Sequence, residues 1–297
     1  MRVLVLGAGG QVGREVCRAA WPGSFELAPL DRNAADITKA SAVSAVMARE
    51  QPDLVINLAA YTAVDRAESE PEMAWAVNCA GAALIAASCG ERAIPLVHLS
   101  TDYVFDGRKS EPYSEGDAVN PLNVYGRSKE AGERAVRAAA PRHIILRTAW
   151  VYGAYGSNFV KTILRLGAEH PVLRVVADQH GCPTAAADIA AALIAIARHI
   201  ERGEMQWGTF HFAAAGCTSW HAFAEEIVAL ARALGGWSGG SGPRVEPITT
   251  DQYPTAARRA ANSVLDCRKI AAFGISRPPW RSSLPAVVRE LVEAQNR

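Results

Sequence analysis

Short, mostly apolar runs alternate with longer segments of helical composition through the first half of the chain. The apolar runs are Val3–Leu6, Phe25–Leu30, Leu54–Leu58, Pro95–Leu99 and Ile144–Leu146. Such runs are expected of strands in a parallel sheet that is covered on both faces. The helical segments between them are Gln11–Ala20, Lys39–Glu50, Pro71–Glu91 and Tyr125–Ala140. This alternation predicts an α/β fold with a doubly wound parallel sheet of the Rossmann type.

The pattern becomes less regular after Trp150. Helices are expected, between connections rich in glycine and proline, over Asn158–Glu169, Ala185–Arg202, Trp220–Leu234 and Leu284–Gln295. One connection, residues 235–243, has the composition of a flexible surface loop. We therefore expect a Rossmann domain over residues 1–150, rejoined by part of residues 184–214. Residues 151–297 are expected to form mainly a smaller mixed α/β domain that closes over a ligand.

Composition narrows the classes of protein that this chain can represent. Of its 297 residues, 49% are hydrophobic and 21% are charged, as in an ordinary soluble globular protein. The net charge is +1 and the basic residues are scattered, so we expect no nucleic-acid partner. We expect no membrane partner either, because no signal peptide is visible and the longer apolar runs read as too short to span a bilayer. The six cysteines show no CxxC spacing, which favours reduced thiols in a cytoplasmic protein.

A glycine-rich turn follows the first expected strand. Gly7, Gly10 and Gly13 have the GxxGxxG spacing. A glycine at the strand end permits a tight turn, a second lets the backbone approach a pyrophosphate, and a third lets the helix pack close to the strand. The N-terminus of the following helix then directs free N–H groups toward the phosphates. The turn therefore predicts a dinucleotide site in the first domain.

Asp31 and Arg32 stand at the end of the next strand, about 20 residues after the glycine turn. An acid at this place holds the adenosine ribose hydroxyls and favours NAD, whereas an adjacent arginine can accept the 2′-phosphate of NADP. The pair leaves the choice open, and we expect either NADPH or NADH to bind. Asp36 and Ile37 lie where they could approach the adenine, although an isolated aspartate in a loop is more often only solvated.

A tyrosine and a lysine, Tyr125 and Lys129, are four residues apart in an expected helix. Residues at this spacing lie on one helix face, so the hydroxyl and the ammonium group can point into the same cleft. A nearby positive charge lowers the pKa of a phenol, which lets Tyr125 give a proton to a substrate oxygen near neutral pH. Thr101 follows the strand Pro95–Leu99, at the sheet edge where such folds bind ligands, and could be a second donor to that oxygen. Its alternative role is to cap the following loop.

Longer stretches resemble the extended short-chain dehydrogenases and, within them, the dTDP-4-dehydrorhamnose reductases. The resemblance runs nearly end to end and is carried by GAGGQVG (7–13), PDLVINLAAYTAVDRAESEPE (52–72), VHLSTDYVFDG (97–107), NPLNVYGRSKEAGE (120–133), LRTAWVYG (146–153), DQHGCPT (178–184) and YPT with NS (253–263). The glycine turn and YxxxK are shared by the whole superfamily. The segments AAYTAVDRAESEP (59–71), STDYVF (100–105) with NPLNVYG (120–126), and RTAWVYG (147–153) together look specific to the reductase group.

The resemblance implies a role for each matching residue. The pyrophosphate would be held by Gly7, Gly10, Gln11 and Val12, the adenosine ribose by Asp31 and Arg32, and the cofactor would be lined by Ala59, Ala60 and Tyr61. The catalytic set would be Thr101, Tyr125 and Lys129, with Lys129 also bonding the nicotinamide ribose. The sugar pocket would be lined by Thr62, Val64, Asp102 and Trp150. The implied reaction reduces the C4 keto group of dTDP-4-dehydro-β-L-rhamnose to dTDP-L-rhamnose.

Two positions depart from the family's pattern. Many members have an Arg-Pro pair in the late segment, whereas here Arg259 precedes Ala260. Arg259 could still reach the nucleotide phosphates of the substrate. Some relatives are dimers with Mg²⁺ held by interface glutamates. Glu15 fits one such ligand, but the region around Asp188 lacks the matching glutamate, so we assign no metal and expect a monomer or a homodimer.

Two other functions remain open from the sequence. A sugar-nucleotide epimerase or dehydratase of the same fold would keep NAD bound through its cycle. A non-catalytic regulatory subunit would bind a partner enzyme, although the presence of Tyr125 and Lys129 argues against it. The nucleotide of the sugar donor and the polysaccharide that receives the sugar are not determined by these motifs.

Overall fold

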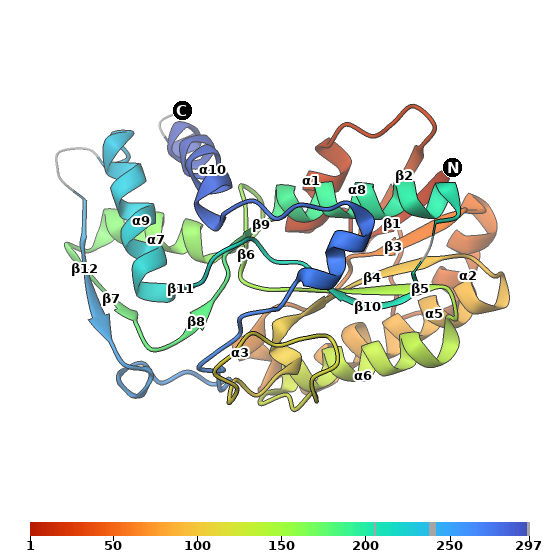
Figure 1. Cartoon of the computed structure of the whole chain (residues 1–297), viewed down its shortest axis with the longest axis horizontal. Coiled ribbons are helices and arrows are strands. Elements are labelled where there is room, and N and C mark those ends of the chain that lie inside the picture. The colour runs from red at the N-terminus through yellow and green to blue at the C-terminus, as the bar shows by residue number, and fades with distance from the viewer. Residues whose placement is uncertain (205, 238–241, 296–297) are drawn as a thin grey trace.

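A six-stranded parallel sheet forms the centre of the protein in the computed structural model, which describes residues 1–204, 206–237 and 242–295 (Figure 1). Its strands lie in the order β10-β5-β4-β3-β1-β2. They are β1 (Arg2–Leu6), β2 (Glu26–Leu30), β3 (Leu54–Asn57), β4 (Leu96–Thr101), β5 (His143–Thr148) and β10 (Gly208–His211). All five neighbouring pairs are parallel. This confirms the predicted doubly wound α/β fold.

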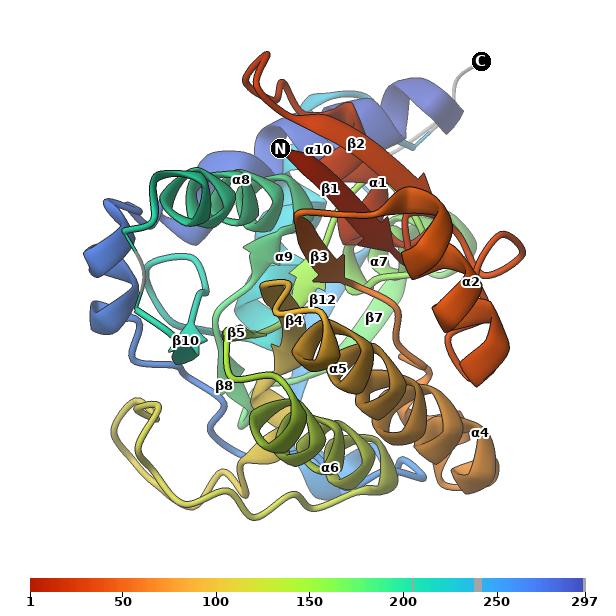
Figure 2. The same ribbon diagram turned by 90° about the vertical axis from the view of Figure 1, so that its right-hand side faces the viewer.

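Helices cover both faces of the sheet (Figure 2). One face carries α1 (Gln11–Arg18) and α8 (Ala186–Arg202), and the other carries α2 (Ala40–Glu50), α5 (Ala82–Glu91) and α6 (Val124–Ala139). Strand β3 is buried at every residue because side chains on both of its faces meet helices. Burial on both faces is the reason that the strands read as continuous apolar runs in the sequence.

The expected helix Pro71–Glu91 is continuous but not uniform. It consists of α4 (Pro71–Trp75), a π-helical turn over Ala76–Gly81 and α5. By length and composition these 21 residues are apolar enough to cross a membrane, so the expectation that no apolar run is long enough was wrong. The run packs in the fold, since 44% of its most apolar window is buried and both the π-helical turn and α5 contact α6. Such a core helix is weak support for a membrane span.

The second half of the chain forms a smaller layer beside the carboxyl ends of the sheet strands (Figure 1). Its helices are α7 (Phe159–Glu169), α9 (Trp220–Ala233) and α10 (Trp280–Gln295), and they pack with the parallel pair β7 (Val172–Val176) and β12 (Arg244–Ile248). These elements share a hydrophobic cluster of their own. Short strand pairs complete the layer: β6 (Val151–Tyr152) with β9 (Thr184–Ala185), and β8 (His180–Gly181) with β11 (Thr218–Ser219).

Two differences from the sequence expectations lie in this half. Helix α10 begins at Trp280, four residues before the expected start at Leu284. The buried Trp280 side chain lies in the first turn of the helix, and Pro285 is accommodated in the second turn. The expected surface loop over residues 235–243 falls partly on residues 238–241, which lie outside the described residues. Residues 184–214 return to the sheet through α8, which contacts α1, and through β10, which pairs with β5.

Candidate active site

The glycine turn requires glycine for steric reasons. Gly7 has a φ of +81°, and a Cβ there would lie 2.5 Å from the backbone N of Ala59. A Cβ on Gly13 would overlap the carbonyl oxygen of Gly7. Gly10 caps α1 with no side-chain hydrogen bond, so the first N–H groups of this helix face the turn.

A first cleft opens over this turn. Nine of the expected cofactor residues line it: Gly7, Gly10, Asp31, Arg32, Asp36, Ile37, Ala59, Ala60 and Tyr61. Asp31 accepts hydrogen bonds from the backbone N–H groups of Asn33 and Ala34, both at 3.0 Å. Asp36 accepts a hydrogen bond from the Thr38 hydroxyl at 2.7 Å, and hydrogen bonding to Thr38 lowers the pKa of Asp36. Both carboxylates are therefore held in place by their own loops.

A buried asparagine that the sequence reasoning missed fixes one wall of the first cleft. The side chain of Asn78, in the π-helical turn, accepts from Tyr61 N at 2.8 Å and donates to Tyr61 O at 3.1 Å. It also donates to Ser128 Oγ on α6 at 3.0 Å. The Tyr61 hydroxyl in turn donates to Glu70 at 2.6 Å. π-Helical turns are frequent at functional sites, but nothing in the local sequence marks this one.

A second, larger cleft of about 590 Å³ adjoins the first. Its lining brings together the expected pyrophosphate, catalytic and sugar-pocket residues, namely Gly10, Gln11, Val12, Thr62, Val64, Thr101, Asp102, Tyr125, Lys129 and Trp150. Gly10, Leu58 and Ala60 line both clefts. A ligand can therefore extend from the carboxyl edge of β1 and β2 to the residues that follow β4.

Tyr125 lies in the first turn of α6, which Asn123 caps by accepting from Gly126 N at 2.8 Å. Its ring packs edge-on against Tyr103, with centroids 5.3 Å apart. Burial raises the pKa of Tyr125, and a hydrogen bond with Thr101 opposes this rise. The sequence argument expected Lys129 to lower this pKa, but burial raises it, and the opposing effect comes from Thr101. The phenol is thus held protonated, which is the form that a proton donor needs.

Lys129 is buried one turn after Tyr125, with 2% of its surface exposed. Its Nζ donates to the carbonyl oxygen of Leu99 at 2.7 Å, beside the end of β4. Burial lowers the pKa of Lys129 to about 8, and the charge of Glu133 opposes this. This lysine can therefore change its protonation state near neutral pH.

Asp102 follows Thr101 at the start of a single 3₁₀ turn, Asp102–Val104. Its Oδ1 accepts from the Thr101 hydroxyl at 3.0 Å. Its Oδ2 is buried without a hydrogen-bond partner in the described part of the chain. Burial raises the pKa of Asp102 to about 6. A buried carboxylate oxygen that lacks a donor, at the wall of a polar pocket, is suited to accept a ligand hydroxyl.

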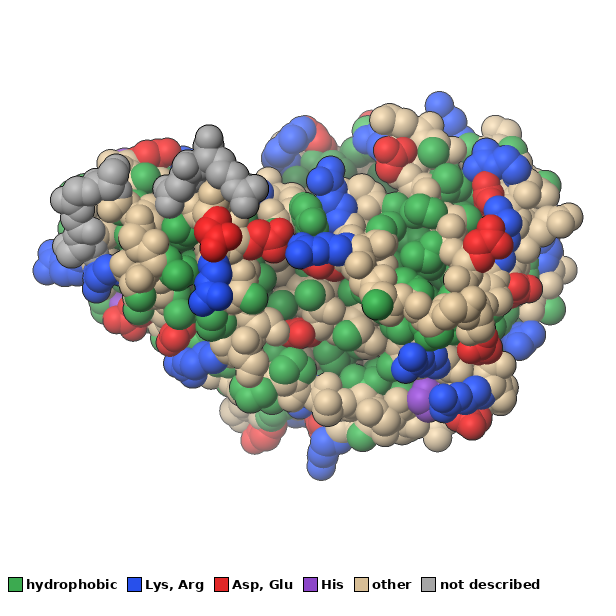
Figure 3. Space-filling model, turned by 90° about the horizontal axis from the view of Figure 1, so that it is seen from above, with side chains coloured by type: hydrophobic (Ala, Val, Ile, Leu, Met, Phe, Trp, Pro, Cys, Tyr) green, Lys and Arg blue, Asp and Glu red, His purple; other side chains and the backbone are tan. Residues whose placement is uncertain are grey.

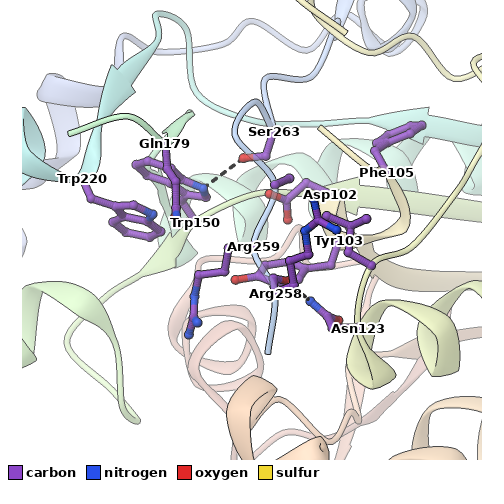
Figure 4. Close-up of a pocket in the computed structure, with 12 residues that line it drawn as sticks. Asp102, Tyr103, Phe105, Asn123, Trp150, Gln179, Trp220, Arg258, Arg259 and Ser263 are labelled. Carbon is purple, nitrogen blue, oxygen red and sulfur yellow. Dashed lines mark hydrogen bonds between the residues drawn. The ribbon is translucent and has the colours of Figure 1, made fainter. Parts of the chain in front are cut away.

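Two stacked indoles form the opposite wall of that pocket (Figure 4). Trp150 and Trp220 are parallel within 6°, with ring centroids 3.5 Å apart. Trp150 has a φ of +48° and donates from Nε1 to Ser263 Oγ at 3.0 Å. A Cβ on Gly181 would overlap the Trp150 ring, so this glycine makes room for it. Trp220 was missed because no local pattern indicates a partner 70 residues away.

Arg259 lines the same pocket but is already paired. Its guanidinium donates to both carboxylate oxygens of Asp65, at 3.1 Å and 2.7 Å. Asp65 lies in α3 (Val64–Ala67), so this ion pair joins the late segment to the first half of the chain. The adjacent Arg258 is exposed and lines the pocket beside Arg259 (Figure 4).

The surface of the protein carries charged side chains of both signs. On the face shown in Figure 3, basic and acidic side chains are interspersed. Within residues 1–204, 206–237 and 242–295, no group of three or more His, Cys, Asp or Glu side chains could hold a metal ion. Glu15 lies on α1, where burial raises its pKa and the charge of Glu290 acts in the same direction.

The chain is similar to known proteins over nearly its whole length. Residues 1–293 match the family described as RmlD substrate binding domain. A dTDP-4-dehydrorhamnose reductase of Aggregatibacter actinomycetemcomitans is 45% identical over 286 residues, covering 95% of this chain and 97% of that protein. The crystal structure of a dTDP-4-dehydrorhamnose reductase from Clostridium acetobutylicum has a TM-score of 0.88 and 38% identity, over 97% of this chain and 98% of that one. That of Bacillus anthracis, in complex with NADP, has a TM-score of 0.87 and 35% identity, over 96% and 98%.

Proposed function

The chain belongs to the RmlD substrate binding domain family, and from this premise we propose that it is an oxidoreductase that reduces the C4 keto group of dTDP-4-dehydro-β-L-rhamnose. The product is dTDP-L-rhamnose, and the reaction is the last step in the synthesis of this sugar donor. The observation that carries the proposal is the convergence of Thr101, Tyr125 and Lys129 in one cleft that is continuous with the glycine turn. Relatives that align over nearly the full length of this chain are named dTDP-4-dehydrorhamnose reductase.

The cofactor is NADPH or NADH, which supplies the hydride when bound. The glycine turn packs closely because Gly7 and Gly13 lack side chains that would overlap the neighbouring backbone, and Gly7 and Gly10 line the first cleft. The proposed cofactor residues are Gly7, Gly10, Gln11, Val12, Asp31, Arg32, Asp36, Ile37, Ala59, Ala60, Tyr61, Tyr125 and Lys129. Asp31 and Arg32 both line the adenosine side of the cleft, which supports use of either dinucleotide.

The proton is supplied by the chain's own side chains. Tyr125, kept protonated by burial, donates to the C4 oxygen, and the Thr101 hydroxyl turns away from Asp102 to donate a second hydrogen bond to it. Lys129 is close enough to the same cleft to stabilise the phenolate and restore its proton. Thr62, Val64, Asp102 and Trp150 line the sugar end, and Arg259 contributes to the nucleotide end of the substrate site. Asp65 already neutralises Arg259, which makes its role there partly structural.

The organisation of the chain follows the same proposal. Residues 1–150 with part of 184–214 hold the dinucleotide, and residues 151–297 mainly hold the nucleotide sugar. The partner is the small-molecule nucleotide sugar, with no nucleic acid or membrane, and the protein acts as a monomer or a homodimer. The cytoplasm is its proposed compartment, in keeping with free thiols at Cys17, Cys79, Cys89, Cys182, Cys217 and Cys267.

The test follows nicotinamide absorbance during incubation with enzymatically made dTDP-4-dehydro-L-rhamnose. NADPH and NADH are compared in parallel, with Tyr125→Phe as the control. Oxidation that requires both protein and keto sugar, and that disappears in Tyr125→Phe, supports the reductase and ranks the cofactors. Folded protein that binds NADPH but oxidises neither cofactor contradicts it. NAD that co-purifies stoichiometrically would instead favour an epimerase or dehydratase.

A further inference from the structure

Two polar residues lie side by side inside an apolar face of the sheet. Asn57 on β3 and His98 on β4 are register partners, and each has 1% of its surface exposed. Their neighbours in register are Leu6 on β1 and Ile145 on β5, both in the hydrophobic cluster beneath α2, α5 and α6. Burying polar groups in such a face is costly unless they are hydrogen-bonded. The face of α6 that covers them carries Lys129, and the three side chains form a chain of contacts.

The direction of the hydrogen bonds in this chain is determined at its far end. The backbone N–H of Ala59 donates to Asn57 Oδ1 at 3.1 Å. The Asn57 amide nitrogen must therefore be the atom that faces His98 Nδ1, at 3.0 Å. An amide nitrogen only donates, so Nδ1 accepts and carries no proton. Burial, assisted by the charge of Lys129, lowers the pKa of His98, so the imidazole is neutral and its one proton is on Nε2.

This tautomer directs an N–H at the lysine. His98 Nε2 lies 3.4 Å from Lys129 Nζ, which also donates to the Leu99 carbonyl at 2.7 Å. An ammonium group has donors only, so it opposes the Nε2–H dipole. An uncharged amine has a lone pair that can accept from Nε2–H while it still donates to Leu99.

We propose that Asn57 and His98 are positioning residues that favour the uncharged amine of Lys129, so that this lysine exchanges its proton near neutral pH during turnover. The inference rests on the proposed function for the catalytic use of Lys129, but the tautomer itself does not. The lowered pKa of Lys129 has the direction that this arrangement requires.

The other ionisable groups near Lys129 do not account for this preference. On α6, Glu133 favours the ammonium form, but it is itself paired with Arg147 of β5 at 2.7 Å. Tyr125 is kept neutral by burial, and Asp102, at the end of β4, titrates at about 6. Burial is the main cause of the lowered pKa of Lys129, and the Nε2–H of His98 is the side-chain contact that adds to this effect at Nζ.

The first test measures the tautomer in the unaltered protein. Nitrogen-15 NMR of histidine-labelled protein distinguishes a protonated from an unprotonated ring nitrogen, and the His98 signals are assigned by their through-space contacts to the Asn57 amide. His211 is an internal comparison, because its Nδ1 lies 3.1 Å from the Tyr113 carbonyl and must carry the proton. We expect Nε2–H for His98 and Nδ1–H for His211, both unchanged between pH 6 and about 9. An Nδ1–H tautomer or a charged ring at His98 would overturn the inference, whatever the enzyme's activity.

The second test inverts the tautomer. Asn57→Asp keeps the side-chain shape, and its ionised carboxylate offers only acceptors, so above the pKa of this group Nδ1 takes the proton and Nε2 accepts from the ammonium. The alkaline limb of kcat/KM should move up by about one pH unit, which is a tenfold change in proton concentration. Thermal unfolding and NADPH affinity show that the variant is folded. If it does not fold, the NMR test on the unaltered protein decides.

A double-variant cycle separates this effect from direct attraction between the new carboxylate and Lys129. In a His98→Leu background the carboxylate remains but the relay through the imidazole is absent. The pH shift caused by Asn57→Asp should then fall to less than half. A shift of the same size in both backgrounds would overturn the role of His98. Absence of keto-sugar reduction by the unaltered enzyme would contradict the proposed function alone, since the tautomer is measured without substrate.

Discussion

The indole rings of Trp150 and Trp220 stack at a centroid distance of 3.5 Å. Trp150 follows β5 in a left-handed conformation, and Trp220 is the first residue of α9. The stack joins the end of the sheet to the second layer, and both rings line the clefts where the sugar is expected. Trp220 therefore packs against Trp150 and forms part of the wall of the proposed substrate site.

Removal of this support should weaken substrate binding more than cofactor binding. Trp220→Ala leaves Trp150 without its stacking partner, and an aromatic pair contributes ~0.5–1.5 kcal/mol beyond area burial. We expect KM for the nucleotide sugar to rise about tenfold, the equivalent of ~1.4 kcal/mol. The dissociation constant of NADPH should change less than about twofold. Trp75→Ala, which removes a 40% exposed indole on α4, is the matched control and should leave KM unchanged.

Tyr125→Phe removes the proposed proton donor without changing the shape of the ring. General acid catalysis typically contributes ~10²–10⁴ in rate, so kcat should fall at least a hundredfold. NADPH affinity, measured by fluorescence, should change little. Tyr113→Phe is the control, because the Tyr113 hydroxyl bonds Asp106 at 2.9 Å and Tyr113 lines neither of the two proposed clefts. Near-full activity in Tyr125→Phe would show that the assigned donor is wrong.

Gly7→Ala should impair the dinucleotide site. The left-handed backbone costs a non-glycine residue ~1–2 kcal/mol, and the new methyl group would also press on the Ala59 backbone. We expect a lower melting temperature and NADPH binding weakened by at least about tenfold. Gly116→Ala is matched to it, because a Cβ at Gly116 meets nothing within 4 Å. Equal NADPH affinity in both variants would contradict the role given to the turn.

Asp102→Asn should stabilise the fold while it harms the site. Folding raises the pKa of Asp102 from 3.8 to about 6, so the folded protein holds this proton more tightly. The favourable contribution of the protonated form is complete below the unfolded pKa of 3.8 and is lost as the pH rises through 6. The gain in unfolding free energy should be near zero at about pH 4 and reach ~2–3 kcal/mol at about pH 8.

Chemical denaturation of Asp102→Asn across this pH range tests the sign, and the exposed Asp251→Asn is the control. Substrate affinity should fall in Asp102→Asn at neutral pH, because the amide replaces a carboxylate oxygen that can accept a sugar hydroxyl. A stability gain that does not depend on pH would show that burial of charge is not the cause.

Arg147→Met should be strongly destabilising. Arg147 donates to both oxygens of Glu133, at 2.9 Å and 2.7 Å, and Glu133 is fully buried. Breaking a buried pair costs ~3–5 kcal/mol, and Arg137, which also donates to Glu133 at 3.0 Å, offsets part of this loss. Arg165→Met, which breaks the exposed Arg165–Glu169 pair, should cost less than ~1 kcal/mol. Denaturant unfolding of the two variants gives the comparison, and similar losses would contradict the assignment.

Most of the sheet, and the place in the fold of the proposed catalytic residues, could be predicted because their signals are local. A strand covered on both faces must be apolar throughout, so β1, β3, β4 and β5 could be read directly from the chain. Tyr125 and Lys129 share a helix face by spacing alone. Thr101 could be located because the sequence places it just after the expected strand Pro95–Leu99, and in the structure it is the last residue of β4. The ends of helices were less certain, as the early start of α10 at Trp280 shows.

The remaining parts of the site depend on contacts between distant segments. The Trp150–Trp220 stack, the Asp65–Arg259 ion pair and the bonds from Asn78 to Tyr61 have no local pattern. His98 reads in sequence as an ordinary core residue, and only its register with Asn57 and the approach of Lys129 give it a partner and a direction.

The sequence by itself determined the fold class, and it located the proposed dinucleotide turn and the proposed catalytic pair, because periodicity and steric need act within a few residues. The tertiary structure decided the protonation states and the shape of the substrate wall. Burial, which no single segment controls, raises the pKa of Tyr125 and of Asp102 and lowers that of Lys129. Hydrogen-bond direction passes from Ala59 through Asn57 and His98 to Lys129 only once three separate segments of the chain, β3 with the residues after it, β4 and α6, have packed together.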